Sequence, residues 1–198
     1  MIKHDEGYIK FNIKWEEKAF DLSLYDFQNL NTCHDKLYNI GLIGAYPNLI
    51  GFGNISIRAT GNKFIISGSA TGNIKQLSEK DYSLVTKYDI DENLIHCEGL
   101  TKASSESLSH AAVYESNPEI KAVIHIHHLE MWEKYIHNLP TTNKNAEFGT
   151  PEIADEMKKL VIQNSGILIM GGHQEGIISY GKSINEAEEI ILTYFNKI

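Results

Sequence analysis

The 198-residue chain is 42% hydrophobic and has a formal net charge of -8 at pH 7, which predicts one compact domain over residues 1–198 and argues against a nucleic-acid binder with a basic surface. Its two cysteines, Cys33 and Cys97, are too few for a disulfide framework, which favours a reducing compartment. Residues 1–6 lack the apolar core of a signal peptide and no run approaches the roughly 20 apolar residues of a membrane span, so we expect a cytoplasmic protein with no membrane partner.

The first half of the chain is predicted to contain several strands and one long helix. The helix, over 22–43, is expected to end at Gly41 and Gly44. The tripeptide at 60–62, Thr-Gly-Asn, predicts a hairpin turn, and Ser78 with an aspartate three residues later predicts a short capped helical turn. The expected strands of this half are 8–15, 49–58, 63–67, 82–90 and 94–97.

The second half is predicted to alternate between helices and strands. Ser105 is the expected N-cap of a helix that runs to Glu115, Pro151 begins another helix that Gly166 ends, and Ser183 caps the last helix. The expected strands are 123–127, 167–170 and 176–180. Because hairpin-rich strands are interspersed with helices, we expect an α/β fold with a mixed, mostly antiparallel central sheet covered by helices.

Two histidines separated by one residue lie in the apolar run 123–127, Val-Ile-His-Ile-His. Alternate side chains of a strand point to the same face, so His125 and His127 would lie side by side. Two imidazoles on one face can bind a divalent metal, and a buried imidazole needs a ligand or a hydrogen bond. The alternative is a pair of hydrogen-bonded histidines on a half-exposed strand.

His173 is the expected third metal ligand. It lies in a glycine-rich turn, 171–176, that follows an apolar strand, and such turns present side chains toward clefts. Neither cysteine has a partner at short spacing, so histidine and carboxylate would bind the metal. Three imidazoles with one open position would form a Lewis acid that polarises a carbonyl. Taken alone, His173 also fits an ordinary loop residue, and the nearby Glu175, like Glu147, is expected to be solvated.

Two further stretches are candidate binding sites for an anion. At 102–106 the chain combines Ser104 and Ser105 with the N–H groups of a helix start, which suits a phosphate or a carboxylate. Glu106 is then a candidate general base or metal ligand, although a simple helix cap explains the same residues. The loop 67–72, with Asn54 upstream, is small and hydroxyl-rich like an anion-binding loop, but it has no P-loop lysine.

Taken together, five short motifs resemble the class II aldolase/adducin family, the group of fuculose-phosphate aldolase and ribulose-phosphate 4-epimerase. They are Gly-Asn-Ile-Ser-Ile-Arg (53–58), Ser-Ser-Glu (104–106), His-Ile-His (125–127), Phe-Gly-Thr-Pro-Glu (148–152) and Gly-His-Gln-Glu-Gly (172–176), in the family's order. The resemblance implies a three-layer α/β/α fold. It also implies a homo-oligomer, commonly a tetramer, with sites near the subunit interfaces.

The resemblance further implies a divalent metal, most often Zn²⁺ with Co²⁺ or Mn²⁺ as alternatives, on His125, His127 and His173. Glu106 would be a ligand of the resting metal that moves away and becomes the catalytic acid/base when substrate binds. The groups implied to bind the substrate phosphate are Asn54, Thr71, Gly72, Ser104 and Ser105. The implied enzyme is a lyase, an aldolase that cleaves or forms a carbon–carbon bond next to a carbonyl of a small sugar phosphate or related hydroxy-carbonyl compound through a metal-bound enediolate.

Two alternatives stay open. The segment between His127 and Phe148 is shorter than in the sugar-phosphate aldolases, and that segment normally carries a proton donor, so a 4-epimerase or a dehydratase on the same site is the nearest alternative. The second alternative is a non-catalytic, adducin-like interaction domain. Such domains lose the metal histidines, whereas this chain retains all three together with Glu106.

Overall fold

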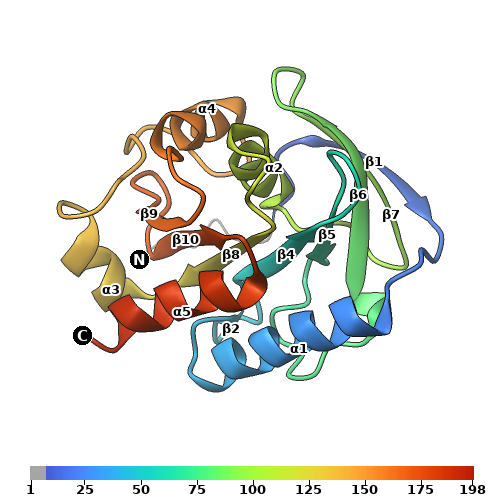
Figure 1. Ribbon diagram of the computed structural model, residues 1–198, viewed down its shortest axis with the longest axis horizontal. Coiled ribbons are helices and arrows are strands. Elements are labelled where there is room, and N and C mark those ends of the chain that lie inside the picture. Colours follow the sequence, from blue (N-terminus) through green and yellow to red (C-terminus); the bar gives the residue numbers. More distant parts are fainter. Residues whose placement is uncertain (1–7) are drawn as a thin grey trace.

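The fold has three layers, with helices on both faces of a mixed central sheet (Figure 1). The structure, a computed structural model, describes residues 8–198, so the expectation about a signal peptide at 1–6 lies outside the described residues. Within this range the main sheet has eight strands in the order β1-β7-β6-β5-β4-β8-β10-β9. Strands β1 and β7 pair in parallel, and the other neighbours pair antiparallel. The predicted α/β/α fold with a mixed, mostly antiparallel sheet is confirmed.

The elements have the following bounds. The strands of the main sheet are β1 (Asn12–Glu17), β4 (Asn54–Arg58), β5 (Phe64–Ser67), β6 (Tyr82–Asp89), β7 (Leu94–Gly99), β8 (Ala122–His127), β9 (Gly166–Ile169) and β10 (Gly176–Gly181). A small hairpin consists of β2 (Gly44–Ala45) and β3 (Gly51–Phe52). The helices are α1 (Leu24–Asn39), η1 (Glu79–Asp81), α2 (Ser107–Ser116), α3 (Leu129–Tyr135), α4 (Pro151–Leu160) and α5 (Ile184–Phe195), and none of those in the described part of the chain has the length and apolarity needed to cross a membrane.

Most of the local start and stop signals act as predicted. Helix α1 ends just before Gly41, which has φ of 78° and was the predicted stop, while its start is capped by the Ser23 side chain, which accepts a hydrogen bond from the Asp26 N–H and was not predicted. Gly61, with φ of 68°, lies in the turn that joins β4 to β5. The Ser78–Asp81 capping box forms at η1. These elements are therefore determined by residues close to them in the sequence.

Several predicted boundaries are wrong. The helix expected over 22–43 is shorter and runs from Leu24 to Asn39, and the strand expected over 49–58 is divided at Gly53, whose φ is 77°, into β3 and β4. The first strand, expected at 8–15, forms at 12–17, where it pairs along β7 at the edge of the sheet. Helix α2 is capped by Glu106 rather than by Ser105, because the backbone turns into the helix one residue later. Helix α4 ends at Leu160, and Gly166 instead begins β9. Helix α3 also occupies a stretch for which no element was predicted.

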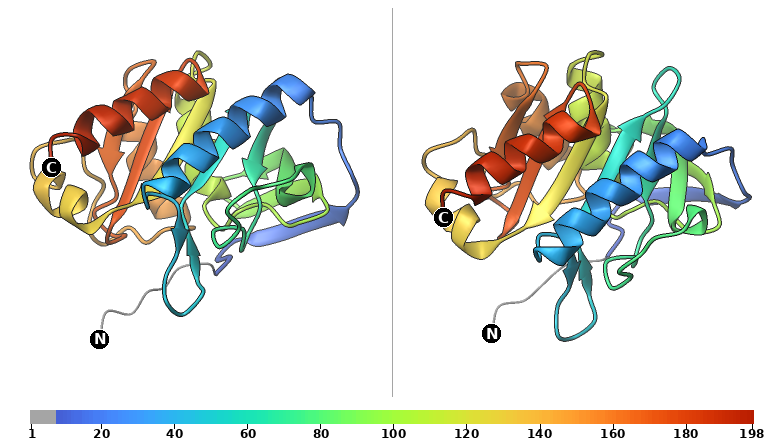
Figure 2. Two further views of the ribbon diagram at one scale, coloured as in Figure 1. Left: turned by 90° about the horizontal axis from the view of Figure 1, so that it is seen from below. Right: turned by 60° about the horizontal axis from the view of Figure 1, so that its bottom comes forward.

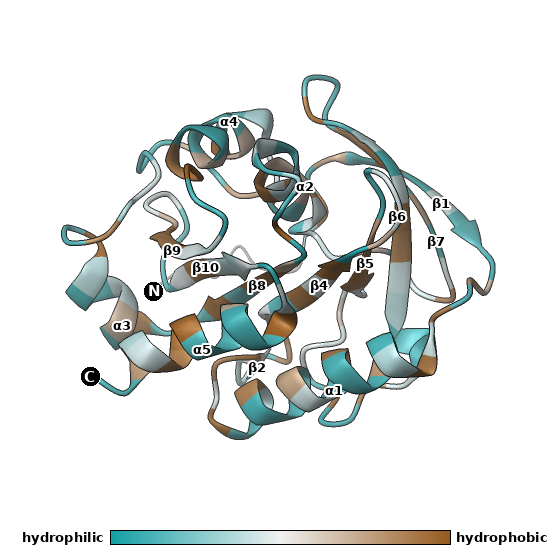
Figure 3. Ribbon diagram, viewed as in Figure 1, coloured by the Kyte–Doolittle hydropathy of each residue, from teal (hydrophilic) through white to brown (hydrophobic). Residues whose placement is uncertain are grey.

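Each face of the sheet has its own apolar core, because alternate residues of a strand point to opposite faces. Phe64 and Ile66 of β5 pack with α2 and α4, whereas Ile65 packs with α1 and α5. Helices α1 and α5 lie side by side on the same face of the sheet in both views of Figure 2. Figure 3 shows hydrophobic residues concentrated in strands such as β5, while α5 alternates between hydrophobic and hydrophilic residues. On β8, Val123 packs in the core on the face of the sheet that α2 covers. Because side chains two residues apart point to the same face, residues 125 and 127 also face α2.

A buried polar cluster joins α2 to β4. The Ser56 Oγ atom lies 2.7 Å from His110 Nδ1 and 2.8 Å from Tyr114 Oη. Burial lowers the pKa of His110 to about 3, so its imidazole stays neutral over the physiological pH range. In the unfolded chain the same imidazole has its ordinary pKa of 6.5. The contribution of His110 to the free energy of unfolding is therefore most favourable above pH 6.5 and decreases as the pH falls below that value.

We expect His110→Asn to reduce the acid sensitivity of folding. Below pH 6.5 the unfolded state binds a proton on His110 that the folded state excludes, so between pH 7 and pH 4.5 this group removes about 2–3 kcal/mol of stability. Asparagine can keep a hydrogen bond to Ser56 but does not titrate. Urea unfolding of both proteins at the two pH values measures the difference. Equal losses of stability in both proteins would contradict the prediction.

Candidate metal centre

Three histidine side chains converge at one end of the sheet. The Nε2 atom of His127 lies 3.1 Å from the Nε2 atoms of both His125 and His173. All three residues are buried, with exposed fractions of 0%, 3% and 7% for His125, His127 and His173. In the described part of the chain, these three histidines form a group of potential metal ligands whose ligand atoms all lie within 4.8 Å of one another. The three predicted ligands are thus brought together from two distant parts of the chain.

The sheet determines these positions. His125 and His127 point to the same face of β8, as the alternation predicts, and their rings meet edge to face with centroids 4.8 Å apart. His173 lies in the turn between β9 and β10, and β10 pairs directly with β8. The turn can approach β8 closely because a Cβ on Gly176 would lie 2.5 Å from His173 Cδ2. Glycine at 176 is therefore required for the histidines to meet.

The geometry of the cluster fits a divalent metal. Ligands arranged tetrahedrally at zinc–nitrogen distances of about 2.0–2.1 Å lie about 3.3–3.4 Å from one another, which is close to the observed separations of 3.1 Å. The His125 Nδ1 atom lies 3.2 Å from the Ile177 carbonyl oxygen, which can only accept a hydrogen bond. The hydrogen of His125 therefore belongs on Nδ1, and Nε2 presents a lone pair to the cluster, as metal-binding histidines do.

Glu106 lies at the N-cap of α2 and is fully buried. Within the described residues it does not belong to the cluster of close ligand atoms, which consists of the three histidines. Its Oε2 atom accepts a hydrogen bond of 2.6 Å from Ser109 Oγ, one turn further along the helix. The helix start thus holds a carboxylate on the same side of the sheet as the imidazoles, where it can serve as an acid or a base.

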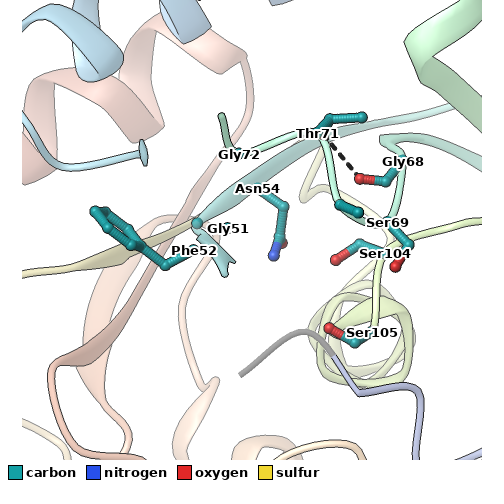
Figure 4. A pocket seen from close by; sticks show the side chains of 11 residues that line it. Gly51, Phe52, Asn54, Gly68, Ser69, Thr71, Gly72, Ser104 and Ser105 are labelled. Carbon is teal, nitrogen blue, oxygen red and sulfur yellow. Dashed lines mark hydrogen bonds between the residues drawn. The ribbon is translucent and has the colours of Figure 1, made fainter. Parts of the chain in front are cut away.

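A pocket beside the histidines gathers all five residues that the resemblance assigns to phosphate binding, namely Asn54, Thr71, Gly72, Ser104 and Ser105. Figure 4 shows the amide of Asn54 and the hydroxyls of the two serines around this pocket. Asn54 pairs directly with His125 across the sheet, so the pocket adjoins the cluster. The buried Oδ1 atom of Asn54 has no hydrogen-bond partner within residues 8–198, and because it can only accept, it suits a hydroxyl of a ligand, whereas an anion would be met by the Nδ2 donors of the same amide.

The pocket is formed by backbone segments that approach each other very closely. A Cβ on Gly72 would lie 2.4 Å from the Gly44 carbonyl oxygen and 2.6 Å from Gly51 Cα. Gly53 has φ of 77°, and a Cβ there would lie 2.8 Å from Ile43 Cγ1. The residues that line the pocket include no lysine or arginine, so an anion would meet neutral N–H and O–H donors.

Sequence reasoning missed one functional candidate and misjudged another. Tyr46, in the β2–β3 hairpin, lies with its hydroxyl 3.0 Å from His127 Nδ1 and donates a hydrogen bond of 2.7 Å to Glu175 Oε2. Glu175 was expected to be solvated, but its side chain is 14% exposed and lies 3.7 Å from the same Nδ1 atom. The adjacency of Glu175 to His173 was a weak indication, whereas no pattern in the sequence identifies Tyr46.

Comparison with known families gives a match over most of the chain. Residues 47–194 match the sequence model described as the Class II Aldolase and Adducin N-terminal domain. This range contains the three histidines, Glu106 and the pocket.

The individual proteins that this chain resembles are named after different reactions. The chain is 26% identical over 174 residues to the 3-oxo-tetronate 4-phosphate decarboxylase of Haemophilus influenzae, covering 73% of this chain and 77% of the relative. It is also 26% identical over 157 residues to a protein of Mycoplasma pneumoniae named probable L-ribulose-5-phosphate 4-epimerase, covering 73% of this chain and 63% of that relative. The solved structure of an L-fuculose 1-phosphate aldolase superposes with a TM-score of 0.69 at 19% identity, covering 89% of this chain and 84% of the other. The reactions named for these three proteins differ, and the superposition shows that this chain shares the fold of the aldolase.

Proposed function

Since the chain belongs to the class II aldolase and adducin family, we propose that it is a divalent-metal-dependent lyase that acts on a small sugar phosphate or a related hydroxy-carbonyl compound. Members of this family include aldolases, epimerases and decarboxylases. The observation that carries the proposal is the convergence of three buried imidazoles beside a pocket of neutral hydrogen-bond donors. The predicted reaction is an aldol cleavage or its reverse.

His125, His127 and His173 would hold the cation, most often Zn²⁺ in this family, with Co²⁺ or Mn²⁺ as alternatives. A bound divalent cation acts as a Lewis acid and stabilises negative charge that develops on a substrate carbonyl oxygen. A set of three histidines would leave a fourth position for a ligand from outside, whereas a structural site is usually closed by four protein ligands.

Glu106 would move the proton. Its carboxylate is buried on the same side of the sheet as the histidines, and the hydroxyl of Ser109 holds one oxygen in place. In this role the carboxylate would take a proton from a substrate hydroxyl or return one to carbon. General acid–base catalysis by a positioned carboxylate requires this combination of reach and fixed geometry.

The pocket lined by Asn54, Thr71, Gly72, Ser104 and Ser105 would bind the substrate phosphate. Its hydroxyl and amide donors suit an anion, and the direct pairing of Asn54 with His125 would place the rest of a short substrate against the imidazoles. We expect a small substrate, because Asn54 of the pocket and His125 of the histidine cluster are paired on adjacent strands and the two sites therefore lie close together.

A different reaction on the same site is the second candidate. A 4-epimerase or a dehydratase would use the same cation and carboxylate, and the names of the two relatives favour an epimerase or a decarboxylase. The adducin-like, non-catalytic alternative is disfavoured by the retained histidines and Glu106.

The deciding experiment is a screen of the metal-loaded protein against short sugar phosphates and their unphosphorylated analogues. Release of dihydroxyacetone phosphate or lactaldehyde identifies an aldolase, carbon dioxide a decarboxylase, and an inverted carbon seen by NMR an epimerase. Each hydrogen bond to a charged phosphate contributes about 1.5–3 kcal/mol, so loss of the phosphate should lower kcat/KM at least about 100-fold. Metal binding without turnover of any compound would favour the non-catalytic alternative.

The assembly and location are proposed on the same grounds. We expect one domain over residues 1–198, a homotetramer with sites near its subunit interfaces, a cytoplasmic location, and no nucleic-acid partner. Light scattering of the purified protein gives the mass of the assembly, and a monomeric mass would contradict the tetramer.

A further inference from the structure

A chain of hydrogen bonds reaches His127 at Nδ1, the ring nitrogen that does not face the other two histidines. The Tyr46 hydroxyl lies 3.0 Å from His127 Nδ1, and it donates a hydrogen bond of 2.7 Å to Glu175 Oε2. These three residues come from the β2–β3 hairpin, from β8 and from the β9–β10 turn. The β2–β3 hairpin projects from the three layers in both views of Figure 2, and Tyr46 is the first residue of the loop that joins its two strands.

The directions of these hydrogen bonds determine the tautomer of His127. A tyrosine hydroxyl has one hydrogen, and here that hydrogen points to a carboxylate, which only accepts when ionised. The Tyr46 oxygen must then accept from His127 Nδ1–H. The Nε2 atom of His127 consequently presents a lone pair to the Nε2 atoms of the other two histidines.

Packing holds the chain of hydrogen bonds in place. The Phe52 ring lies 4.7 Å from the Tyr46 ring and 5.6 Å from the His127 ring, measured between centroids. The His127 side chain is 2% exposed and that of Glu175 is 14% exposed, so water competes weakly for these hydrogen bonds. Glu175 has φ of 71°, a conformation that is uncommon for glutamate and that the tight β9–β10 turn imposes.

We propose that Tyr46, supported by Glu175, is a positioning residue that holds His127 in the Nδ1–H tautomer and thereby raises the affinity of the cluster for a divalent cation. The inference rests on the proposed metal function. Tyr46 contacts the ring nitrogen remote from the cluster, so it acts through His127 and not as a proton donor to substrate. Partners of this kind typically contribute 10–100-fold to metal affinity.

The test is the variant Tyr46→Phe, which keeps the ring that packs on Phe52 and removes the hydroxyl. We expect Co²⁺ and Zn²⁺, measured by chelator competition at one pH, to bind about 10–100-fold more weakly, with an altered visible spectrum of the Co²⁺ protein. The ¹⁵N shifts of His127 in the metal-free protein should change from the Nδ1–H tautomer to a mixture of tautomers. Tyr25→Phe, at a tyrosine that is 74% exposed on α1, is the matched control and should change neither quantity.

Glu175→Gln and Glu175→Ala separate positioning from general stability. Glutamine still accepts the Tyr46 hydrogen bond, so Glu175→Gln should lose less metal affinity than Glu175→Ala. If the parent protein binds the metal and Tyr46→Phe binds it equally well with an unchanged tautomer, the inference is wrong and the proposed function stands. If the parent protein binds no divalent cation, the proposed function itself fails.

Discussion

His127→Ala is expected to abolish retention of a divalent cation while leaving the protein folded. The Nε2 atom of His127 lies 3.1 Å from the Nε2 atoms of both His125 and His173. Its removal leaves only two of the three imidazoles to bind the cation. Partners one step away from a metal already contribute 10–100-fold, so loss of this ligand should weaken binding by at least about 100-fold. Metal analysis after gel filtration and chelator competition measure the effect.

The fold should survive this change because the backbone of His127 is independently paired. Its N–H donates to the Leu42 carbonyl, and the residue pairs with Gly176 in β10. His137→Ala, at an exposed histidine, is the matched control and should keep the metal. A collapse of the circular dichroism spectrum in His127→Ala would indicate a structural metal site. Full metal retention with a native spectrum would remove His127 from the ligand set.

Glu106→Gln is expected to lose turnover and retain the metal. The side chain keeps its size, and its carbonyl oxygen can still accept the hydrogen bond from Ser109, but it cannot take up a proton. Loss of a positioned general base lowers kcat by about 10²–10⁴-fold. Metal affinity should fall much less, because the cluster of close ligand atoms consists of the three histidines. Deuterium exchange at the substrate carbon, followed by NMR, isolates the proton-transfer step.

Glu115→Gln provides the control on the same helix. Glu115 is exposed and forms an ion pair with Lys158 at 3.0 Å, so its neutralisation removes a carboxylate of similar chemistry far from the cluster. Turnover of this variant should match that of the parent protein. Unchanged turnover in Glu106→Gln would remove Glu106 from the mechanism, and metal loss in Glu106→Gln would make it a ligand.

Tight hairpin turns and the caps of helices follow from residues near one another in the sequence. The turn around Gly61 and the caps at Ser78 and Ser183 depend on contacts within a few residues, which is why they were predicted correctly. The end of α4 and the start of β1 depend on partners elsewhere in the fold. Gly166, for example, belongs to a strand because β10 pairs with it, and no local pattern indicates that pairing.

The sequence by itself determined the common face of His125 and His127, because the two-residue period of a strand requires no knowledge of the fold. It also indicated His173, Glu106, Asn54, Ser104 and Ser105 through their motifs, and Thr71 and Gly72 through the hydroxyl-rich loop 67–72. The tertiary structure alone decided that His173 meets β8 through the pairing of β8 with β10, and that Tyr46 and Glu175 meet at His127. These contacts join residues as many as 129 positions apart, and strand pairing and packing between such distant segments leave no periodic trace in the sequence.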